Sequence, residues 1–292
     1  MEYTIENEYL KVTVTTWGAQ VKSVVRKADG VEHMWQADKS VWGYHAPILF
    51  PYTGKLTGGV LEARGGSYTC GQHGFARLLE HSFVKQTKDT IQLELTDCPE
   101  TMAIWPYKFR LLSTVTLEGD AVHHKLTVEN RDGETIRFGI GYHPAFTVPF
   151  DAAHTATDYE LRFSKEESPL CLSTQPNGLV NGKCYYLGRN LDTIPIDDQL
   201  FAHDSHCMVN LQSKTLGLYE RGTGRGVVCE IGDFPYTLIW SKPGMPKFVC
   251  IEPWNSLPGP EEGGSKWDDR PAAAAVEPGE SWSTCLTTHF VR

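Results

Sequence analysis

The sequence lacks any uncharged apolar run long enough to cross a bilayer, and its first residues show neither the basic nor the apolar region of a signal peptide. Basic residues are also few, with 27 Lys and Arg against 36 Asp and Glu and a formal net charge of -9. Nucleic acids and anionic membranes reward a basic surface, so we expect neither as a partner. We expect a cytoplasmic protein that binds a small molecule.

Nucleotide-binding and disulfide signatures are absent as well. No G-x-G-x-x-G follows a predicted strand, and no G-x-x-x-x-G-K-[ST] occurs, so hydride and phosphoryl transfer lose their main support. The chain contains no C-x-x-C pair, and its 8 cysteines are scattered. Without a signal peptide, this spacing favours reduced thiols that pack as small hydrophobes. We therefore predict no nucleotide cofactor and no disulfide framework.

Helical periodicity is missing too, and alternation with a period of two replaces it. Residues 91–97 alternate apolar and polar side chains, and residues 108–133 read as two long strands joined at Gly119 and Asp120. Turn signals recur along the chain, without a repeat or a break in composition. The pattern predicts an all-β protein, one large antiparallel β-sandwich domain covering residues 1–292.

The stretch TIRFGIGYHPAF, residues 135–146, carries an unusual second face. Strand alternation places Ile136, Phe138, Ile140 and Tyr142 on one side, and Arg137, Gly139, Gly141 and His143 on the other. The first face predicts core. On the second face, two residues without side chains precede a histidine. This predicts empty space in which a ligand could approach the backbone. A sheet bend with a histidine that is solvated or satisfied in the core is the alternative.

Glu252 is the most unusual titratable residue, because it interrupts the apolar strand FVCIEPW. A buried carboxylate is costly unless it is paired, so Glu252 is either a working acid or base or half of a structural ion pair. His73 and Arg77, in QHGFAR, could hold a hydroxyl or an anion, or could lie in a surface turn. Asp204, in HDSHC, has an exposed polar turn as its alternative.

The same HDSHC segment suggests a metal site made by His203, Asp204, His206 and Cys207, completed by His73 or His143. Alternation in a strand would send His203 and His206 to opposite faces. We therefore predict no metal site, and retain a metal-dependent isomerase as an alternative to be tested.

In chain order, these stretches resemble the aldose 1-epimerase family, the galactose mutarotases. QHGFAR and GYHPAF look like the family's two histidine motifs, HDSHC like its aspartate segment, and FPYTLIWSKPG with FVCIEPWNS like its glutamate segment. The combination HGFAR, WSKP and CIEPW is most similar to the shorter bacterial branch associated with lactose-utilisation operons. The resemblance covers nearly the whole chain.

This resemblance implies a galactose mutarotase-like β-sandwich with a sugar in an open cleft, and exchange of α and β anomers without a cofactor. By position, Glu252 matches the general base, His143 the general acid, and His73 and Asp204 the groups that hold sugar hydroxyls. Trp240, Phe75 or Trp254 could offer an aromatic face to the ring, or could be core. The reaction needs Glu252 ionised and His143 protonated, a state that their mutual attraction favours and burial opposes.

Two positions depart from the family pattern. Lys55 stands in FPYTGKL where many members carry arginine, and Arg77 could compensate for it. Leu238 stands near the place of the family's substrate-binding glutamine. These departures leave open a carbohydrate-binding or sensing protein with little catalysis. A phosphorylated sugar, paired with Lys55 and Arg77, is a further option. The sugar, the pathway and the oligomeric state are not predicted.

Overall fold

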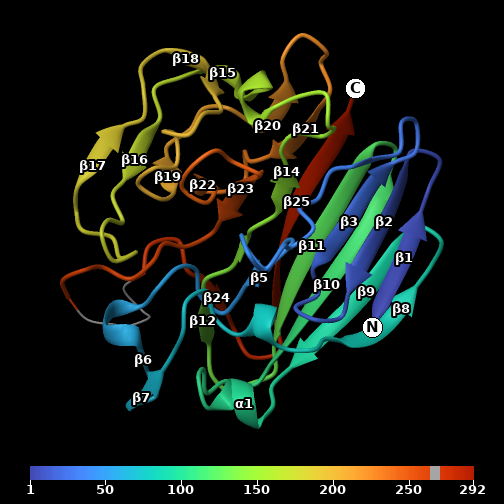
Figure 1. The fold of residues 1–292 in the computed structure, drawn as a ribbon. Helices are drawn as coiled ribbons and strands as arrows, with labels where there is room; N and C mark the ends of the chain where they lie inside the picture. Colours follow the sequence, from blue (N-terminus) through green and yellow to red (C-terminus); the bar gives the residue numbers. More distant parts are fainter. Residues whose placement is uncertain (264–269) are drawn as a thin grey trace.

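The structure is a computed structural model that describes residues 1–263 and 270–292, and strands dominate it (Figure 1). Its largest sheet has nine strands, and all of their ladders are antiparallel. In spatial order these strands are β18 (Leu191–Pro195), β15 (Tyr159–Glu167), β20 (Thr215–Glu220), β21 (Gly226–Glu230), β25 (Ser281–Val291), β11 (Ala121–Asn130), β10 (Phe109–Glu118), β9 (Thr90–Thr96) and β8 (Ser82–Gln86).

The hairpin of β10 and β11 confirms the prediction from alternation. Its ladder runs from Phe109 opposite Asn130 to Glu118 opposite Ala121, which leaves Gly119 and Asp120 as the turn. Gly119 has a φ of 56°, a conformation that glycine adopts without strain. Every second residue of β10 is buried, from Phe109 to Leu117, while the residues between them are partly exposed. One face of the nine-stranded sheet therefore forms the core.

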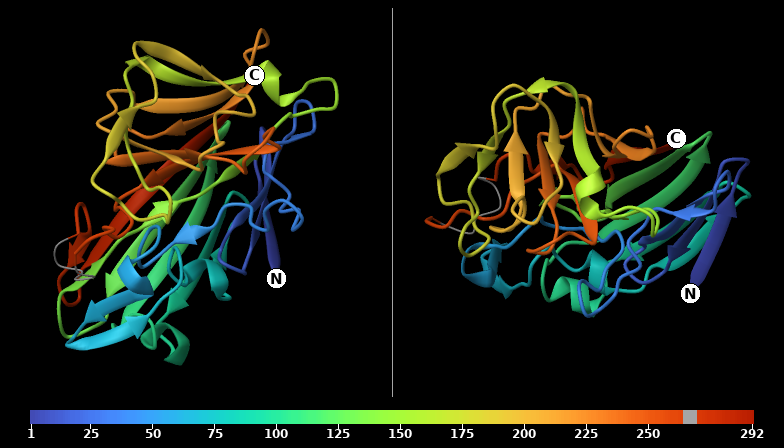
Figure 2. Two further views of the ribbon diagram at one scale, coloured as in Figure 1. Left: turned by 60° about the vertical axis from the view of Figure 1, so that its left-hand side comes forward. Right: turned by 45° about the horizontal axis from the view of Figure 1, so that its top comes forward.

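Two smaller sheets cover this buried face (Figure 2), and apolar residues of all three sheets belong to one core cluster. An eight-stranded sheet contains β17 (Cys184–Tyr186), β16 (Leu170–Leu172), β19 (His206–Val209), β22 (Tyr236–Trp240), β23 (Phe248–Trp254), β13 (Gly141–Tyr142) and β5 (Ile48–Leu49), with β14 (Ala145–Thr147) paired to β23. A four-stranded sheet contains β1 (Glu2–Glu6), β2 (Leu10–Thr15), β3 (Val21–Arg26) and β4 (Val31–Glu32). The predicted antiparallel β-sandwich is thereby confirmed.

The remaining elements are short. Two small ladders pair β12 (Ile136–Phe138) with β24 (Ala274–Val276), and β6 (Val60–Ala63) with β7 (Gly66–Thr69). Helical turns occur at α1 (Pro99–Met102) and at three 3₁₀ segments, Thr57–Gly59, Ala76–Leu78 and Ala156–Asp158. Within residues 1–263 and 270–292, none of the helices has the length and apolar character that a membrane crossing requires.

The segment around Gly139 and Gly141 corrects one expectation. It forms three short strands, β12, β13 and β14, instead of one, and its two glycines leave no empty space. A β-carbon added to Gly139 would lie 1.9 Å from Ser256 Oγ, and one added to Gly141 would lie 2.6 Å from Trp254 Cδ1. The space that the two glycines leave is therefore filled by Ser256 and Trp254, which follow Glu252 in the chain. The predicted core face is confirmed, because Ile136, Phe138, Ile140 and Tyr142 all belong to the main core cluster.

Candidate active site

A pocket of about 290 Å³ opens on the side of β22 and β23 that faces away from the main core. Alternation along β23 explains this position, because Val249 and Ile251 join the main core while Phe248, Cys250 and Trp254 belong to two separate clusters on the other face. Glu252 has the same parity as this second group. The pocket is lined by Trp42, Gly54, Gln72, His73, Arg77, His143, Thr174, Gly178, Asp204, Ser205, Leu238, Trp240, Lys242, Glu252, Trp254 and Pro258.

Strand register brings the two predicted catalytic residues together. The antiparallel ladders pair Gly141 with Trp254 and Ala145 with Cys250, so His143 arrives beside Glu252. Nε2 of His143 lies 3.2 Å from Oε2 of Glu252. Both side chains are buried at the base of the pocket, with 8% of the His143 side chain and 2% of the Glu252 side chain exposed. This distance allows a proton to pass directly between them.

Burial controls the charge of this pair. It lowers the pKa of His143 to about 3, with the positive charge of Arg77 acting in the same direction. It raises the pKa of Glu252 well above the usual value, and the negative charge of Asp204 adds to this effect. Both shifts favour uncharged groups. Burial thus opposes the imidazolium and carboxylate that the reaction requires, while the 3.2 Å contact between the two groups favours them.

His73 is held by a reciprocal pair of hydrogen bonds with Gly54. The His73 backbone N–H donates to the Gly54 carbonyl at 2.8 Å, and the Gly54 N–H donates to Nδ1 of His73 at 2.9 Å. Because Nδ1 accepts, the proton of the neutral ring must lie on Nε2. Burial, followed by His143 and Arg77, lowers the His73 pKa well below its ordinary value. His73 is therefore neutral, and its Nε2–H faces the Gln72 side-chain amide 3.0 Å away, whose oxygen must be turned toward the ring to accept it.

Three tryptophans surround the pair. The Trp42 ring stacks on the His143 imidazole, with 5.0 Å between ring centroids and 25° between planes. Trp240 meets His143 edge-on at 5.6 Å, and Trp254 meets His73 edge-on at 5.5 Å. Aromatic faces suit the C–H surface of a pyranose, and they also exclude water from the buried groups.

Asp204 and Arg77 both line the pocket, as the sequence predicts for binding residues. Asp204 is exposed in a turn closed by its N–H, which donates to the Phe201 carbonyl at 3.1 Å. Arg77 is partly buried, donates to the Gln72 carbonyl at 3.0 Å, and lies over the Tyr44 ring at 4.9 Å. Its buried Nε has no hydrogen-bond partner among the described residues. Arg77 therefore retains a donor that no described residue uses.

Two of the other named residues lie away from the pocket. Lys55 is exposed, and its Nζ donates to the Asn177 carbonyl at 2.9 Å, so it steadies the turn that carries Gly178 instead of lining the wall. Phe75 is 2% exposed and packs edge-on against Phe50 at 5.9 Å, which makes it a core residue. The substrate-binding role of Lys55 stays a prediction. For Lys55 to reach a sugar, the turn that contains Asn177 and Gly178 would have to move.

The HDSHC segment does not gather its side chains into a metal site within residues 1–263 and 270–292. Nδ1 of His206 lies 2.8 Å from the Tyr185 hydroxyl, and Nε2 lies 2.6 Å from the Leu200 carbonyl. Cys207 is buried in an apolar cluster. His206 and Cys207 therefore have other partners, and Asp204 lies at the pocket.

Trp42 and Lys242 line the pocket but were not predicted from the sequence. The signal for Lys242 was available, since it belongs to WSKP, directly after strand β22. Trp42 gave none, because its loop is 101 residues from His143 and only the tertiary fold brings the two rings together.

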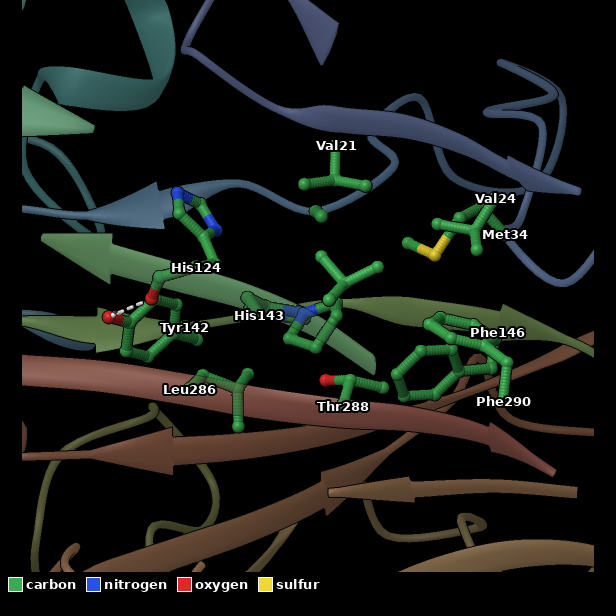
Figure 3. Close-up of a pocket in the computed structure, with 13 residues that line it drawn as sticks. Val21, Val24, Met34, His124, Tyr142, His143, Phe146, Leu286, Thr288 and Phe290 are labelled. Carbon is green, nitrogen blue, oxygen red and sulfur yellow. Dashed lines mark hydrogen bonds between the residues drawn. The ribbon is translucent and has the colours of Figure 1, made fainter. Parts of the chain in front are cut away.

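His143 and its neighbours also border a second cavity, on the core side (Figure 3). Its volume is about 30 Å³, room for about one or two waters. Apolar side chains such as Val21, Met34 and Phe146 line it, and the Tyr142 hydroxyl there donates to the His124 carbonyl at 2.7 Å. A cavity so small and apolar cannot receive a sugar ring, so the candidate active site is the larger pocket.

Comparison with known proteins gives a consistent result. The family model described as aldose 1-epimerase matches residues 1–272. A relative from Lactococcus lactis subsp. lactis, the chromosomal protein LacX, is 31% identical over 287 residues, which cover 95% of each chain.

Two solved structures have nearly the same fold. One is a galactose mutarotase related enzyme from Lactobacillus acidophilus, with a TM-score of 0.93 and 28% identity over 99% of this chain and 97% of that one. The other is a galactose mutarotase-like protein from Lactobacillus casei, with a TM-score of 0.92 and 27% identity over the full length of both chains.

Proposed function

Because the chain belongs to the aldose 1-epimerase family, we propose that it interconverts the α and β anomers of an aldose, with Glu252 as general base and His143 as general acid. One observation carries this proposal above the others. A titratable pair 3.2 Å apart lies in a pocket of about 290 Å³ that is also lined by aromatic and polar side chains.

Anomer exchange requires two coupled proton movements. The C1 hydroxyl loses its proton to Glu252 while the ring oxygen gains one from His143, and the C1–O5 bond breaks to give the open-chain aldehyde. The C1 end then rotates, and closure on the other face returns both protons. Each positioned proton transfer contributes roughly 10²- to 10⁴-fold to the rate. His73 and Asp204 would hold hydroxyls away from C1, so that rotation occurs within a fixed ring frame.

Burial favours neutral groups in the sugar-free pair, and a neutral pair suits this cycle. Transfer of the carboxyl proton from Glu252 to His143, across 3.2 Å, produces the carboxylate and imidazolium without exchanging a proton with water. A bound sugar hydroxyl donates to the carboxylate as it forms, and the ring oxygen accepts from the imidazolium. These hydrogen bonds stabilise charges that burial otherwise opposes. The pair therefore becomes charged when a sugar is present to use it.

An exchange experiment by NMR tests the proposal over hexoses, pentoses and their phosphates. We expect protein to broaden or exchange the α and β signals of at least one sugar, and Glu252→Gln to lower the rate by roughly 10²- to 10⁴-fold. Glu280→Gln is the matched control, because Glu280 is exposed and outside the pocket. Wild-type rates in Glu252→Gln would remove this residue from the mechanism.

A carbohydrate-binding or sensing role is the second candidate, and Leu238 favours it. This apolar side chain lies opposite Glu252 in the β22–β23 ladder and lines the pocket, where it offers no hydrogen bond to a sugar. Calorimetric binding of a sugar without exchange of its anomers would select this function over catalysis.

A further inference from the structure

We propose that His143, Cys250 and Glu252 form a binding site for a soft divalent cation, Zn²⁺ or Cd²⁺, and that the bound cation blocks the pair that would move protons. The blocking effect rests on the proposed function. The binding does not, because it depends only on the positions and chemistry of three side chains.

The first argument is geometric. One ligand atom from each of the three residues lies within 4.8 Å of the other two, and the His143 and Glu252 atoms are 3.2 Å apart. A tetrahedral zinc ion, with bonds of about 2.0–2.3 Å, separates its ligand atoms by about 3.3–3.6 Å. The three atoms therefore need to move by about 1 Å or less to surround one ion.

Cys250 supplies the second argument. Its side chain is fully buried, and the proton transfers proposed above give it no part. The ladders place it beside Trp240 on one strand and Ala145 on the other, two residues before Glu252 on the same strand. A thiolate, an imidazole and a carboxylate together favour Zn²⁺ or Cd²⁺ over Mg²⁺ or Ca²⁺, which prefer oxygen ligands.

Binding balances as an exchange of protons for the cation. The Cys250 thiol and the Glu252 carboxyl each release one proton, and neutral His143 donates its lone pair, so a dication leaves the site with no net charge. The three ligands leave a fourth tetrahedral position, which can take water. Once coordinated, His143 and Glu252 can neither give nor accept the protons that anomer exchange requires.

A second group of potential ligands shows why this site is preferred. Asp151, His154 and Glu220 also lie within 4.8 Å of one another. There, the Arg225 guanidinium donates to both carboxylates and already supplies the positive charge. Among the described residues, no Lys or Arg forms an ion pair with Glu252, whose contact is with His143. The positive charge that a metal ion would bring is therefore already supplied by Arg225 in the Asp151 group, whereas no such charge from the described residues lies beside Glu252.

Cadmium titration tests the site directly, because a thiolate bound to Cd²⁺ absorbs in the ultraviolet. The starting protein carries Cys184→Ala and Cys285→Ala, since these two thiols are exposed and would also bind Cd²⁺. We expect one equivalent of Cd²⁺ to produce the band, and Cys250→Ala to remove it. Cys171→Ala is the matched control, because Cys171 is a buried thiol outside the proposed site, and it should keep the band.

Inhibition is measured separately, with ZnCl₂ in the anomer-exchange assay. Cys250→Ala should retain exchange and should raise the inhibitory Zn²⁺ concentration by more than about 100-fold, since loss of even an outer-shell partner costs 10- to 100-fold in affinity. Equal inhibition of both proteins, or a Cd²⁺ band that survives Cys250→Ala, would overturn the proposal. If no sugar is exchanged, the proposed function fails while the cadmium titration still decides the site.

Discussion

Asp204 and Glu252 line the same pocket, and the negative charge of Asp204 helps burial to raise the pKa of the Glu252 carboxyl. In the proposed mechanism, the His143–Glu252 pair is active when the two side chains share one exchangeable proton. Activity should therefore fall at the alkaline end, where the pair loses that proton, as pH passes the raised pKa of Glu252.

Asp204→Asn tests this coupling. Removal of the negative charge makes ionisation of Glu252 easier, so its pKa falls and the alkaline limb of kcat/KM moves to lower pH. The variant should also raise KM, because Asp204 is a predicted hydroxyl-binding residue. The pH profile separates the two effects, since lost binding alone would weaken kcat/KM at every pH without moving the limb.

Trp42→Leu should slow exchange through His143. The stacked indole favours an imidazolium by a cation–π interaction worth about 0.5–2 kcal/mol, which corresponds to a kcat lower by roughly 2- to 30-fold. Trp42→Phe keeps an aromatic face and should recover most of the rate. If Leu and Phe lower kcat equally, stacking has no part in stabilising the acid.

His73 should remain neutral, with its proton on Nε2, well into the acidic range. Its Nδ1 accepts from the Gly54 N–H, so protonation there would lose a hydrogen bond as well as place a charge in a buried site. Nitrogen-15 NMR of the ring distinguishes the tautomers. A chemical shift for Nδ1 typical of N–H at near-neutral pH would contradict this assignment.

Three other buried histidines should make the fold sensitive to acid. Burial lowers the pKa of His33, His81 and His124 from 6.5 to about 4 in each case. As pH falls below 6.5 the unfolded chain gains protons that the folded chain does not, so stability is lost between about pH 6.5 and pH 4. The loss approaches about 3 kcal/mol for each histidine.

Urea unfolding from near-neutral to mildly acidic pH measures this loss. His124→Gln removes one titrating group and should flatten the pH dependence by about one proton, whatever it does to stability at neutral pH. His203→Gln is the control, because His203 is exposed. Equal slopes for the His124 variant and the parent protein would refute the explanation.

Gly139→Ala should destabilise the fold by about 1–3 kcal/mol, because its β-carbon would overlap Ser256 Oγ. Ser256→Gly vacates that space but also removes the contact between Ser256 Oγ and Thr53 Oγ1 at 2.9 Å. In a double-mutant cycle from chemical unfolding, the two changes together should cost less than their sum. Strict additivity would show that the overlap is relieved elsewhere.

Sequence patterns within a few residues predicted the strands and hairpins, because neighbouring residues decide these structures. The alternation from Phe109 to Asn130 specified a hairpin because each residue's neighbours decide which face it occupies. Glu252 and His143 were identified because each is a polar residue within an apolar sequence. Their 3.2 Å contact follows from a ladder between strands more than 100 residues apart, which no local pattern encodes.

The errors have the same origin. Gly139 and Gly141 suggested empty space, and the space is filled by Ser256 and Trp254, which come from a distant strand end. Phe75 could be either a stacking ring or core from the sequence, and only its contact with Phe50 decides between them.

Leu238 carries a consequence for how the pocket could tell one epimer from another. A sugar hydroxyl directed at the Leu238 side chain loses its hydrogen bonds to water and gains none from the protein, at a cost of about 1–3 kcal/mol. Stereoisomers that carry hydrogen in that direction avoid the penalty. Leu238 thus disfavours stereoisomers that direct a hydroxyl at it. A glutamine at this position would instead favour them by a hydrogen bond.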